Sequence, residues 1–235
     1  MNLIIDFGNT SIKAALFDGP RLIETYTGIS TEHLIKLSKE NNPEYLIVSS
    51  VTKSQLEVSN LLGADIIYLS SSLPLPFQIN YKTPQTLGLD RIAGIAGAQE
   101  LFPNQNVLVI DLGTCITYDL IDSKNVYHGG GISPGLKMRF KSLHNFTAKL
   151  PLIEPTNEFE LIGQSTKESI LSGVINGMIS EIDGIIRMYT DKFAHLRIIM
   201  CGGDAKFFEN RIKANIFVAP ELVLMGLNRI LLYNV

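Results

Sequence analysis

The sequence predicts an α/β fold made of two similar lobes, and two observations support this prediction. Short apolar strands alternate along the chain with segments whose apolar residues recur at helical spacing. A short apolar strand that runs into Asp-x-Gly occurs twice, at residues 6–8 and 111–113, which lie 105 positions apart. A repeat of this period indicates two lobes rather than a solenoid, whose repeats are far shorter. We therefore expect an N-terminal lobe at residues 1–104 and a C-terminal lobe at residues 105–235.

The N-terminal lobe is expected to open with a hairpin of two strands. A buried strand at residues 3–5 leads into a polar turn, and a second extended run covers residues 12–17. The patterns that follow predict helices at residues 31–40 and 53–62 and strands at residues 45–51 and 65–69. A further helix at residues 85–102 is rich in glycine and alanine. Because glycine weakens a helix, its presence here indicates that another element approaches this helix closely.

The C-terminal lobe repeats the hairpin and contains the longest helix signal. Strands are expected at residues 107–110, 116–121 and 195–200, and a final helix at residues 221–233. The long helix at residues 166–189 has apolar residues with a helical period, at Ile170, Leu171, Val174, Ile175, Met178, Ile179, Ile182, Ile185 and Ile186. Ser165 and Glu168 predict a capping box at its start. Gly173 and Gly177 are expected to admit a partner helix, from the same lobe or from a second subunit.

Composition excludes several classes of protein. Hydrophobic residues make up 46% of the chain and charged residues 18%, as in a folded globular protein. The formal charge of −3 and the lack of a basic stripe argue against a nucleic-acid partner. Two cysteines and four histidines show no zinc-ligand spacing and suit a reducing compartment. No signal peptide or membrane span is recognised, so we expect a cytoplasmic protein without a membrane partner.

The repeated Asp-x-Gly turn is suited to binding a phosphate chain. Asp6 and Asp111 each follow a buried strand, and the glycine two positions on lets the backbone approach a ligand closely. Two such hairpins would clamp a phosphate chain, with the aspartates near a hydrated magnesium ion. A single copy fits an ordinary hairpin turn, but two matched copies favour phosphoryl transfer. The chain has neither the Gly-Lys-[Ser/Thr] of a Walker A loop nor the protein-kinase motifs.

Two other glycine clusters leave alternatives open. Gly202 and Gly203 follow the strand at residues 195–200, where a bare backbone would let an adenine and ribose lie flat. A plain strand-to-helix turn fits the same two residues. Residues 129–135, with the sequence Gly-Gly-Gly-Ile-Ser-Pro-Gly, fit either a loop tip or a wall beside the phosphates.

Asp90 and Arg91 lie at the start of the small-residue helix. A carboxylate in this position would accept a proton from a substrate hydroxyl, and the arginine would hold a substrate carboxylate as a fork. The same two residues also fit an aspartate stabilised by the helix dipole, next to a solvated arginine.

Taken together, these residues resemble the type III pantothenate kinases, a family in the superfamily of acetate and sugar kinases, actin and heat-shock chaperones. The similarity covers nearly the whole chain. In chain order its motifs are Asp6-Phe7-Gly8-Asn9-Thr10, Ser49-Ser50-Val51, Tyr81-Lys82-Thr83-Pro84, Gly88-Leu89-Asp90-Arg91, Asp111-Leu112-Gly113-Thr114, Gly130-Gly131-Ile132-Ser133-Pro134-Gly135, Leu150-Pro151, Gly163-Gln164-Ser165-Thr166 and Gly202-Gly203. Each motif is short, but the ordered set is specific. The resemblance implies two actin-like, ribonuclease H-like lobes with mixed sheets flanked by helices and a nucleotide cleft between them.

The resemblance further implies ATP-dependent phosphorylation of pantothenate to 4′-phosphopantothenate, the first step of coenzyme A biosynthesis. ATP would be bound by Asp6, Phe7, Gly8, Asn9, Thr10, Ser11, Ile12, Lys13, Thr114, Gly202 and Gly203. Asp90 would be the catalytic base, and pantothenate would contact Tyr81, Gly88, Leu89, Asp90, Arg91 and Thr166. Asp111 would help to hold a monovalent cation, K⁺ or NH₄⁺, and Asp6 is the candidate ligand for Mg²⁺. Members of the family are homodimers.

The chain departs from the family pattern at two places beside the expected nucleotide site. Cys115 and Ile116 stand where members often have alanine and threonine, and Cys201 replaces a threonine that often precedes the glycine pair. Loss of that hydroxyl would alter a nucleotide contact.

Three other functions remain open at this point: a non-catalytic nucleotide-binding regulator of the same fold, a kinase for another small hydroxy acid, and an actin-like filament subunit. The intact Asp6, Asp90, Arg91 and Asp111 favour an active enzyme.

Overall fold

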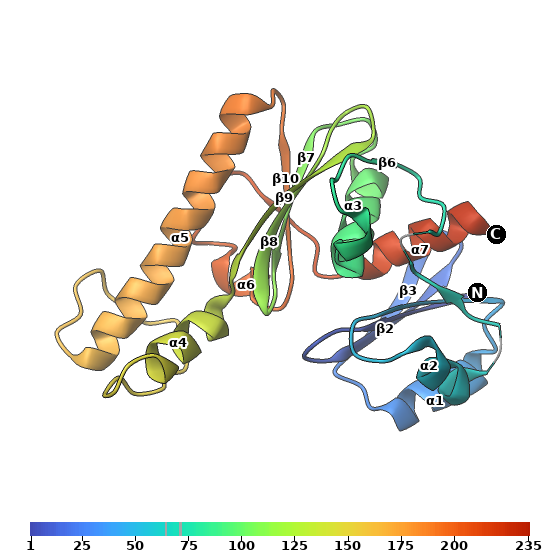
Figure 1. The fold of residues 1–235 in the computed structure, drawn as a ribbon, viewed down its shortest axis with the longest axis horizontal. Coiled ribbons are helices and arrows are strands. Elements are labelled where there is room, and N and C mark those ends of the chain that lie inside the picture. Colours follow the sequence, from blue (N-terminus) through green and yellow to red (C-terminus); the bar gives the residue numbers. More distant parts are fainter. Residues whose placement is uncertain (64, 71) are drawn as a thin grey trace. The chain divides into compact units, whose positions relative to one another are not determined.

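A computed structural model describes residues 1–63, 65–70 and 72–235 of the chain, which divides into two compact units (Figure 1). The first unit comprises Met1–Gln105, Ile121–Gly129 and Glu221–Val235, and the second comprises Asn106–Leu120 and Gly130–Pro220. Both units combine strands with helices, and the predicted α/β class is confirmed.

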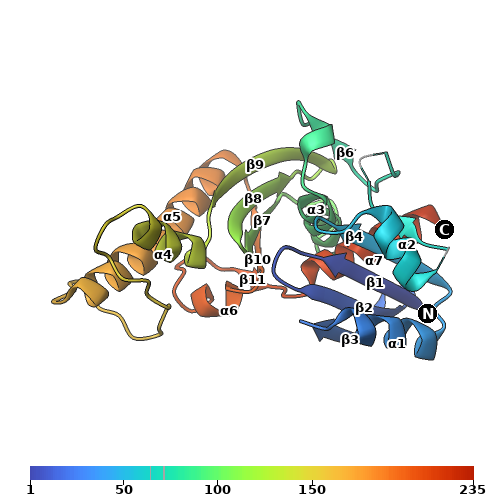
Figure 2. The same cartoon turned by 60° about the horizontal axis from the view of Figure 1, so that its bottom comes forward.

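The first unit is built on a five-stranded mixed sheet. Its strands are β1 (Asn2–Phe7), β2 (Ile12–Asp18), β3 (Arg21–Thr27), β4 (Tyr45–Ser50) and β5 (Ile67–Tyr68), in the order β3-β2-β1-β4-β5. The central strand β1 is antiparallel to β2 and parallel to β4 (Figure 2). The predicted opening hairpin is therefore present, and it lies next to the strand that carries the Ser-Ser-Val motif.

Alternation along β1 determines where its side chains point. Leu3, Ile5 and Phe7 join a core cluster with residues of α1 (Thr31–Asn41) and α2 (Gln55–Leu62). Because successive side chains of a strand point to opposite faces, Asn2, Ile4 and Asp6 face the other side of the sheet. That side is covered by α7 (Leu222–Asn234), and the Asn2 Nδ2 donates a hydrogen bond of 3.1 Å to the Asn228 Oδ1 of this helix.

Helix α7 packs closely against α3 (Leu89–Leu101), as Figure 1 shows. A Cβ atom added at Gly226 of α7 would overlap the Ala93 carbonyl oxygen of α3 and lie 2.7 Å from the Gly97 nitrogen. The close approach predicted from the small residues of α3 is therefore confirmed, with α7 as the approaching element. The helix itself begins at Leu89, later than residue 85, because Pro84–Thr86 forms a separate 3₁₀ turn, η1.

The grouping of the units differs from the expected division at residues 104 and 105, which assigned the final helix to the second lobe. In the structure, α7 belongs to the first unit because its apolar face is buried there against α3 and β1. Ile121–Gly129 also groups with the first unit.

The second unit repeats the strand order of the first. Its strands are β7 (Val107–Leu112), β8 (Cys115–Ile121), β9 (Val126–Pro134), β10 (Arg197–Cys201) and β11 (Phe217–Val218), in the order β11-β10-β7-β8-β9. As in the first sheet, the opening strand has its hairpin partner on one side and a parallel strand, β10, on the other. The short strand β6 (Gln78–Ile79) pairs with the beginning of β9, within the first unit. The internal repeat of the sequence thus extends to sheet topology.

Helices α4 (Leu136–Asn145), α5 (Thr166–Lys192) and α6 (Ala205–Phe208) complete the second unit. The predicted period of α5 is confirmed, because Ile170, Val174, Met178 and Ile182 are buried in one core cluster with strand residues. Its length and composition alone would allow α5 to cross a membrane, but these apolar residues pack on the sheet.

The predicted cap of α5 is only half formed. The Ser165 hydroxyl accepts a 3.3 Å hydrogen bond from the Glu168 amide, as expected. The Glu168 carboxylate accepts from the amide of Gln164, at 2.8 Å, in place of the amide of Ser165. Within the glycine cluster, the loop-tip alternative is wrong, because residues 129–134 form the second half of β9.

Candidate active site

The first Asp-x-Gly turn is the tip of the β1–β2 hairpin. Asp6 pairs with Lys13 and Phe7 with Ile12, so the four residues from Gly8 to Ser11 form the turn. A Cβ atom at Gly8 would lie 3.3 Å from the Ser11 carbonyl oxygen, which leaves little room for a side chain. Asn9 and Thr10 are exposed at the tip, where their polar groups can meet a ligand.

Asp6 is a buried carboxyl with an unusual environment. Burial raises its pKa to about 6, while Lys13 and the nearby Ser49 hydroxyl lower it and the charge of Asp90 raises it. Ser49 lies beside Asp6 on β4, although its Oγ makes no full hydrogen bond with any described residue. A cation nearby would stabilise the charged form of a carboxyl that burial disfavours. The Asp6 site therefore fits the magnesium ion of a bound nucleotide.

The expected substrate motif lies at the start of α3. Gly88 is the N-cap residue, Asp90 is exposed in the first turn, and the Asp90 Oδ1 accepts a 2.8 Å hydrogen bond from the Arg91 amide. Arg91 is only 7% exposed, and its guanidinium carbon lies 5.9 Å from the centre of the Tyr81 ring. Tyr81 and Arg91 are thus neighbours, as the substrate assignment requires.

The first unit therefore brings together three of the predicted groups from separate parts of the chain. The hairpin supplies Asp6 and Lys13, α3 supplies Asp90 and Arg91, and the segment after β6 supplies Tyr81. Helix α3 contacts β4, the strand that carries Ser49 beside Asp6, and the charge of Asp90 raises the pKa of the Asp6 carboxyl. A candidate general base and a candidate metal ligand therefore belong to neighbouring elements of this unit.

The second Asp-x-Gly turn has a tight backbone geometry of its own. The Gly113 amide donates a 3.1 Å hydrogen bond to the Cys115 carbonyl, and a Cβ at Gly113 would lie 3.3 Å from the Asp111 Oδ1. Gly135, at the end of the glycine cluster, donates its amide to the Thr114 carbonyl at 3.2 Å. A Cβ at Gly135 would lie 2.5 Å from that same oxygen, so no larger residue fits against the turn.

The glycine pair after β10 lies against the second turn. Gly202 has a φ of +90°, and a Cβ there would collide with the Asp111 carboxylate and lie 2.6 Å from the Leu112 backbone. Asp204 donates its amide to the Leu112 carbonyl at 3.0 Å. The second unit thus gathers Asp111, Thr114 and Gly202, which the sequence assigned to the nucleotide and the monovalent cation.

Sequence reasoning gave no role to two residues near this turn, Asp204 and Lys137. Asp204 is partly buried, which raises the pKa of its carboxyl, and Lys137 at the start of α4 partly offsets that rise. The signal for Asp204 was its position directly after the glycine pair, whereas nothing in the local sequence connects Lys137 with it.

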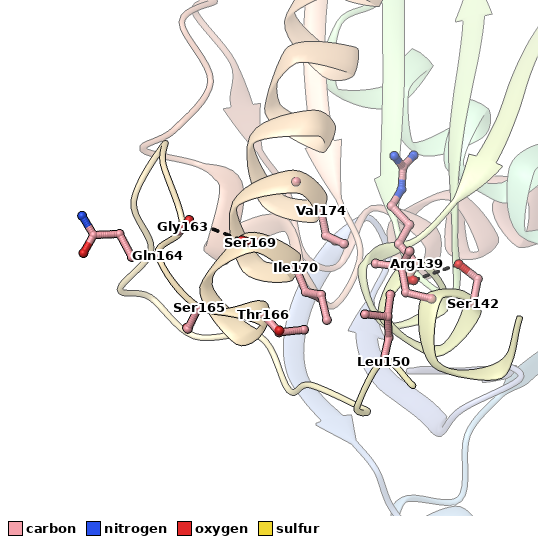
Figure 3. Close-up of a pocket in the computed structure, with 12 residues that line it drawn as sticks. Arg139, Ser142, Leu150, Gly163, Gln164, Ser165, Thr166, Ser169, Ile170 and Val174 are labelled. Carbon is pink, nitrogen blue, oxygen red and sulfur yellow. Dashed lines mark hydrogen bonds between the residues drawn. The ribbon is translucent and has the colours of Figure 1, made fainter. Parts of the chain in front are cut away.

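Thr166, the first residue of α5, lines a groove of about 890 Å³ in the second unit. Arg139, Ser142, Leu143, Leu150, Gly163, Gln164, Ser165, Thr166, Ser169, Ile170, Gly173 and Val174 line the groove. Figure 3 shows Ile170 and Val174 of α5 pointing toward Leu150, while Gln164 points outward. Of the predicted site residues, Thr166 alone is among the described residues that line it.

Comparison with known proteins identifies the family. The model of the type III pantothenate kinase family matches residues 2–188. A type III pantothenate kinase from Cytophaga hutchinsonii is 45% identical over 236 residues and one from Christiangramia forsetii is 47% identical over 240 residues, with 99–100% of each chain covered.

Similar solved structures support the fold. A Baf family protein from Campylobacter jejuni has a TM-score of 0.68 at 21% identity and covers 99% of this chain and 98% of its own. A Sinorhizobium meliloti protein described as a 2-dehydro-3-deoxygalactonokinase has a TM-score of 0.59 at 13% identity, with 98% of both chains covered. At these identities the two structures show the actin-like fold alone. On the family match and the two full-length relatives, this chain belongs to the type III pantothenate kinase family.

Proposed function

We propose that this chain transfers the γ-phosphoryl group of ATP to the hydroxyl group of pantothenate, which gives 4′-phosphopantothenate and begins coenzyme A biosynthesis. The observation that carries this proposal is the contact of Arg91 with the Tyr81 ring beside Asp90 at the start of α3, in the unit that also holds Asp6. The family match over residues 2–188 supports it independently.

The nucleotide would be held by the two Asp-x-Gly turns and the glycine pair. Residues 6–13, Thr114, Gly202 and Gly203 supply backbone amides, hydroxyl groups and the Lys13 cation for the phosphates. Bound ATP supplies the phosphoryl group that is transferred. Asp6 would hold the magnesium ion, and that ion would in turn keep the buried Asp6 carboxyl ionised at neutral pH. Asp111 would help to hold K⁺ or NH₄⁺.

On the substrate side, Asp90 would accept the proton of the pantothenate hydroxyl. Its exposure in the first turn of α3 leaves the carboxylate accessible to a substrate hydroxyl. Arg91 would hold the pantothenate carboxylate through its guanidinium fork. Tyr81, Gly88, Leu89 and Thr166 would complete the contacts with pantothenate.

The proposal includes a homodimer in the cytoplasm. Gly173 and Gly177 are exposed on α5 and Gly184 is half-buried, and a Cβ added at any of the three would meet no described atom within 4 Å. A helix from a second subunit would fit against these small residues.

A phosphotransfer assay tests the function directly. Purified protein is supplied with ATP, Mg²⁺ and pantothenate, with and without K⁺, and the product is measured by mass spectrometry. We expect ATP consumption that depends on pantothenate and rises with K⁺. Pantothenate-independent ATP consumption, or none at all under these conditions, would contradict the proposal.

A further inference from the structure

The backbone of Tyr81 runs beside that of Gly129. Strands β6 and β9 are parallel, with Gln78 opposite Val126 and Ile79 opposite Tyr127. The Asn80 amide continues this pairing by donating a 2.8 Å hydrogen bond to the Tyr127 carbonyl. When this register is continued past the end of β6, Tyr81 stands opposite Gly129, so the fold brings this tyrosine to this glycine although 48 positions separate them.

The ring of Tyr81 has neighbours on several sides. It stacks on the ring of Tyr127, with centres 6.3 Å apart and planes 19° apart, and Tyr127 is fully buried. The guanidinium carbon of Arg91 lies 5.9 Å from the centre of the Tyr81 ring. A Cβ added at Gly129 would lie 2.8 Å from both the Cδ2 and the Cε2 of Tyr81, which is too close for real atoms.

Gly129 meets two separate requirements at once. Its φ of +79° lies in the left-handed region, which residues with a side chain rarely adopt. Its missing side chain leaves the space in which the Tyr81 ring lies. Alanine at this position would push the ring away from the strand, and Arg91, which contacts the ring, would lose part of its support.

We propose that Gly129 and Tyr127 are positioning residues for Tyr81, and that Gly129 thereby sets the width of the pantothenate site. This inference rests on the proposed function, in which Tyr81 and Arg91 contact pantothenate. Gly129 and Tyr127 hold the Tyr81 ring in place, and of these three residues only Tyr81, through its ring, contacts pantothenate.

The first test compares Gly129→Ala with a matched control, Gly28→Ala. Gly28 has a φ of +70° in the same unit, and a Cβ there would meet no described atom within 4 Å. The control therefore carries similar backbone strain without touching Tyr81. We expect Gly129→Ala to raise the KM for pantothenate about tenfold, with kcat changed less than about twofold and the KM for ATP unchanged. The control should leave both KM values unchanged.

A double-mutant cycle shows whether Gly129 acts through Tyr81. Tyr81→Ala alone should raise the KM for pantothenate. In the Tyr81→Ala background, Gly129→Ala should add no further increase, because the ring that it displaces is gone. Independent, additive effects would overturn the inference, as would equal behaviour of Gly129→Ala and Gly28→Ala.

A second pair of variants covers the case in which Gly129→Ala does not fold. Tyr127→Phe keeps the stacked ring and should retain the KM for pantothenate, whereas Tyr127→Leu removes the ring and should raise it. If Tyr127→Leu folds by circular dichroism and leaves this KM unchanged, the inference is wrong. If Tyr81→Ala itself leaves the KM for pantothenate unchanged, the substrate site of the proposed function is wrong, so the two failures can be told apart.

Discussion

Replacing Asp6 with asparagine should make the protein more stable at neutral pH and abolish its activity. The Asp6 carboxyl lies buried at the end of β1, where loss of hydration disfavours its charged form. Asparagine has nearly the same shape and no charge to bury. The variant therefore loses the candidate metal ligand but is relieved of the cost of an ionised carboxylate.

The pKa of Asp6 gives the size and the sign of this effect. The rise from 3.8 to about 6 corresponds to about 3 kcal/mol, at about 1.36 kcal/mol per pH unit. Between these two values the folded protein binds more protons than the unfolded chain does, so the free energy of unfolding falls as the pH rises. The wild type should thus lose about 2 kcal/mol of stability from this group between pH 4 and pH 7, and the variant should not.

Urea unfolding of both proteins at several pH values between 4 and 7.5, without nucleotide or divalent cation, measures this difference. The free energy of unfolding of Asp6→Asn minus that of the wild type should grow by about 2 kcal/mol across the range. Asp18→Asn, an exposed aspartate of the same hairpin, is the control and should change stability by less than about 0.5 kcal/mol. A difference that stays constant with pH would refute the reasoning, whatever its absolute size.

Three further predictions concern other parts of the molecule. Asp90→Asn should lower kcat by about 10²–10⁴, because it removes the base, while ATP binding measured by calorimetry is retained. Arg139→Leu should lower the free energy of unfolding in urea by about 1–2 kcal/mol, because it removes the partly exposed ion pair with Glu181, at 2.5 Å, while Glu181 keeps its hydrogen bond from Tyr118. A loss below about 0.5 kcal/mol would contradict this. Gly226→Ala should lower the free energy of unfolding by about 1–3 kcal/mol, because the added methyl group overpacks against Ala93. If the variant is as stable as the wild type, α3 and α7 can move apart at no cost, and the prediction is wrong.

Patterns that repeat along the chain were the ones that could be predicted. The helical period of α5 needs no knowledge of distant residues, since one face of apolar side chains is sufficient to bury it. The two Asp-x-Gly turns could likewise be recognised from the sequence, because the two segments match each other. The two sheets then proved to share one strand order, which the hairpins alone did not specify.

Features that depend on long-range packing could not be predicted. Gly129 to Gly131 form part of β9 because neighbouring backbone fixes them: a Cβ at Gly130 would overlap the Tyr118 carbonyl oxygen. Glycine itself has a low strand propensity, so the local sequence did not indicate a strand and left a loop tip and a wall beside the phosphates as alternatives. The contact of Tyr81 with Gly129 arises from strand pairing across 48 positions, and the shifted pKa of Asp204 depends on its surroundings in the fold.

The packing of α7 in the first unit has a consequence for how the chain is made. The face of β1 that carries Asn2 and Ile4 is covered by α7, and Asn228 of this helix accepts a hydrogen bond from Asn2 across 226 positions of the chain. During translation, this face stays uncovered until α7 has left the ribosome, so β1 reaches its finished environment long after it has been synthesised. A nascent chain stalled before residue 222 would present this apolar sheet face to chaperones.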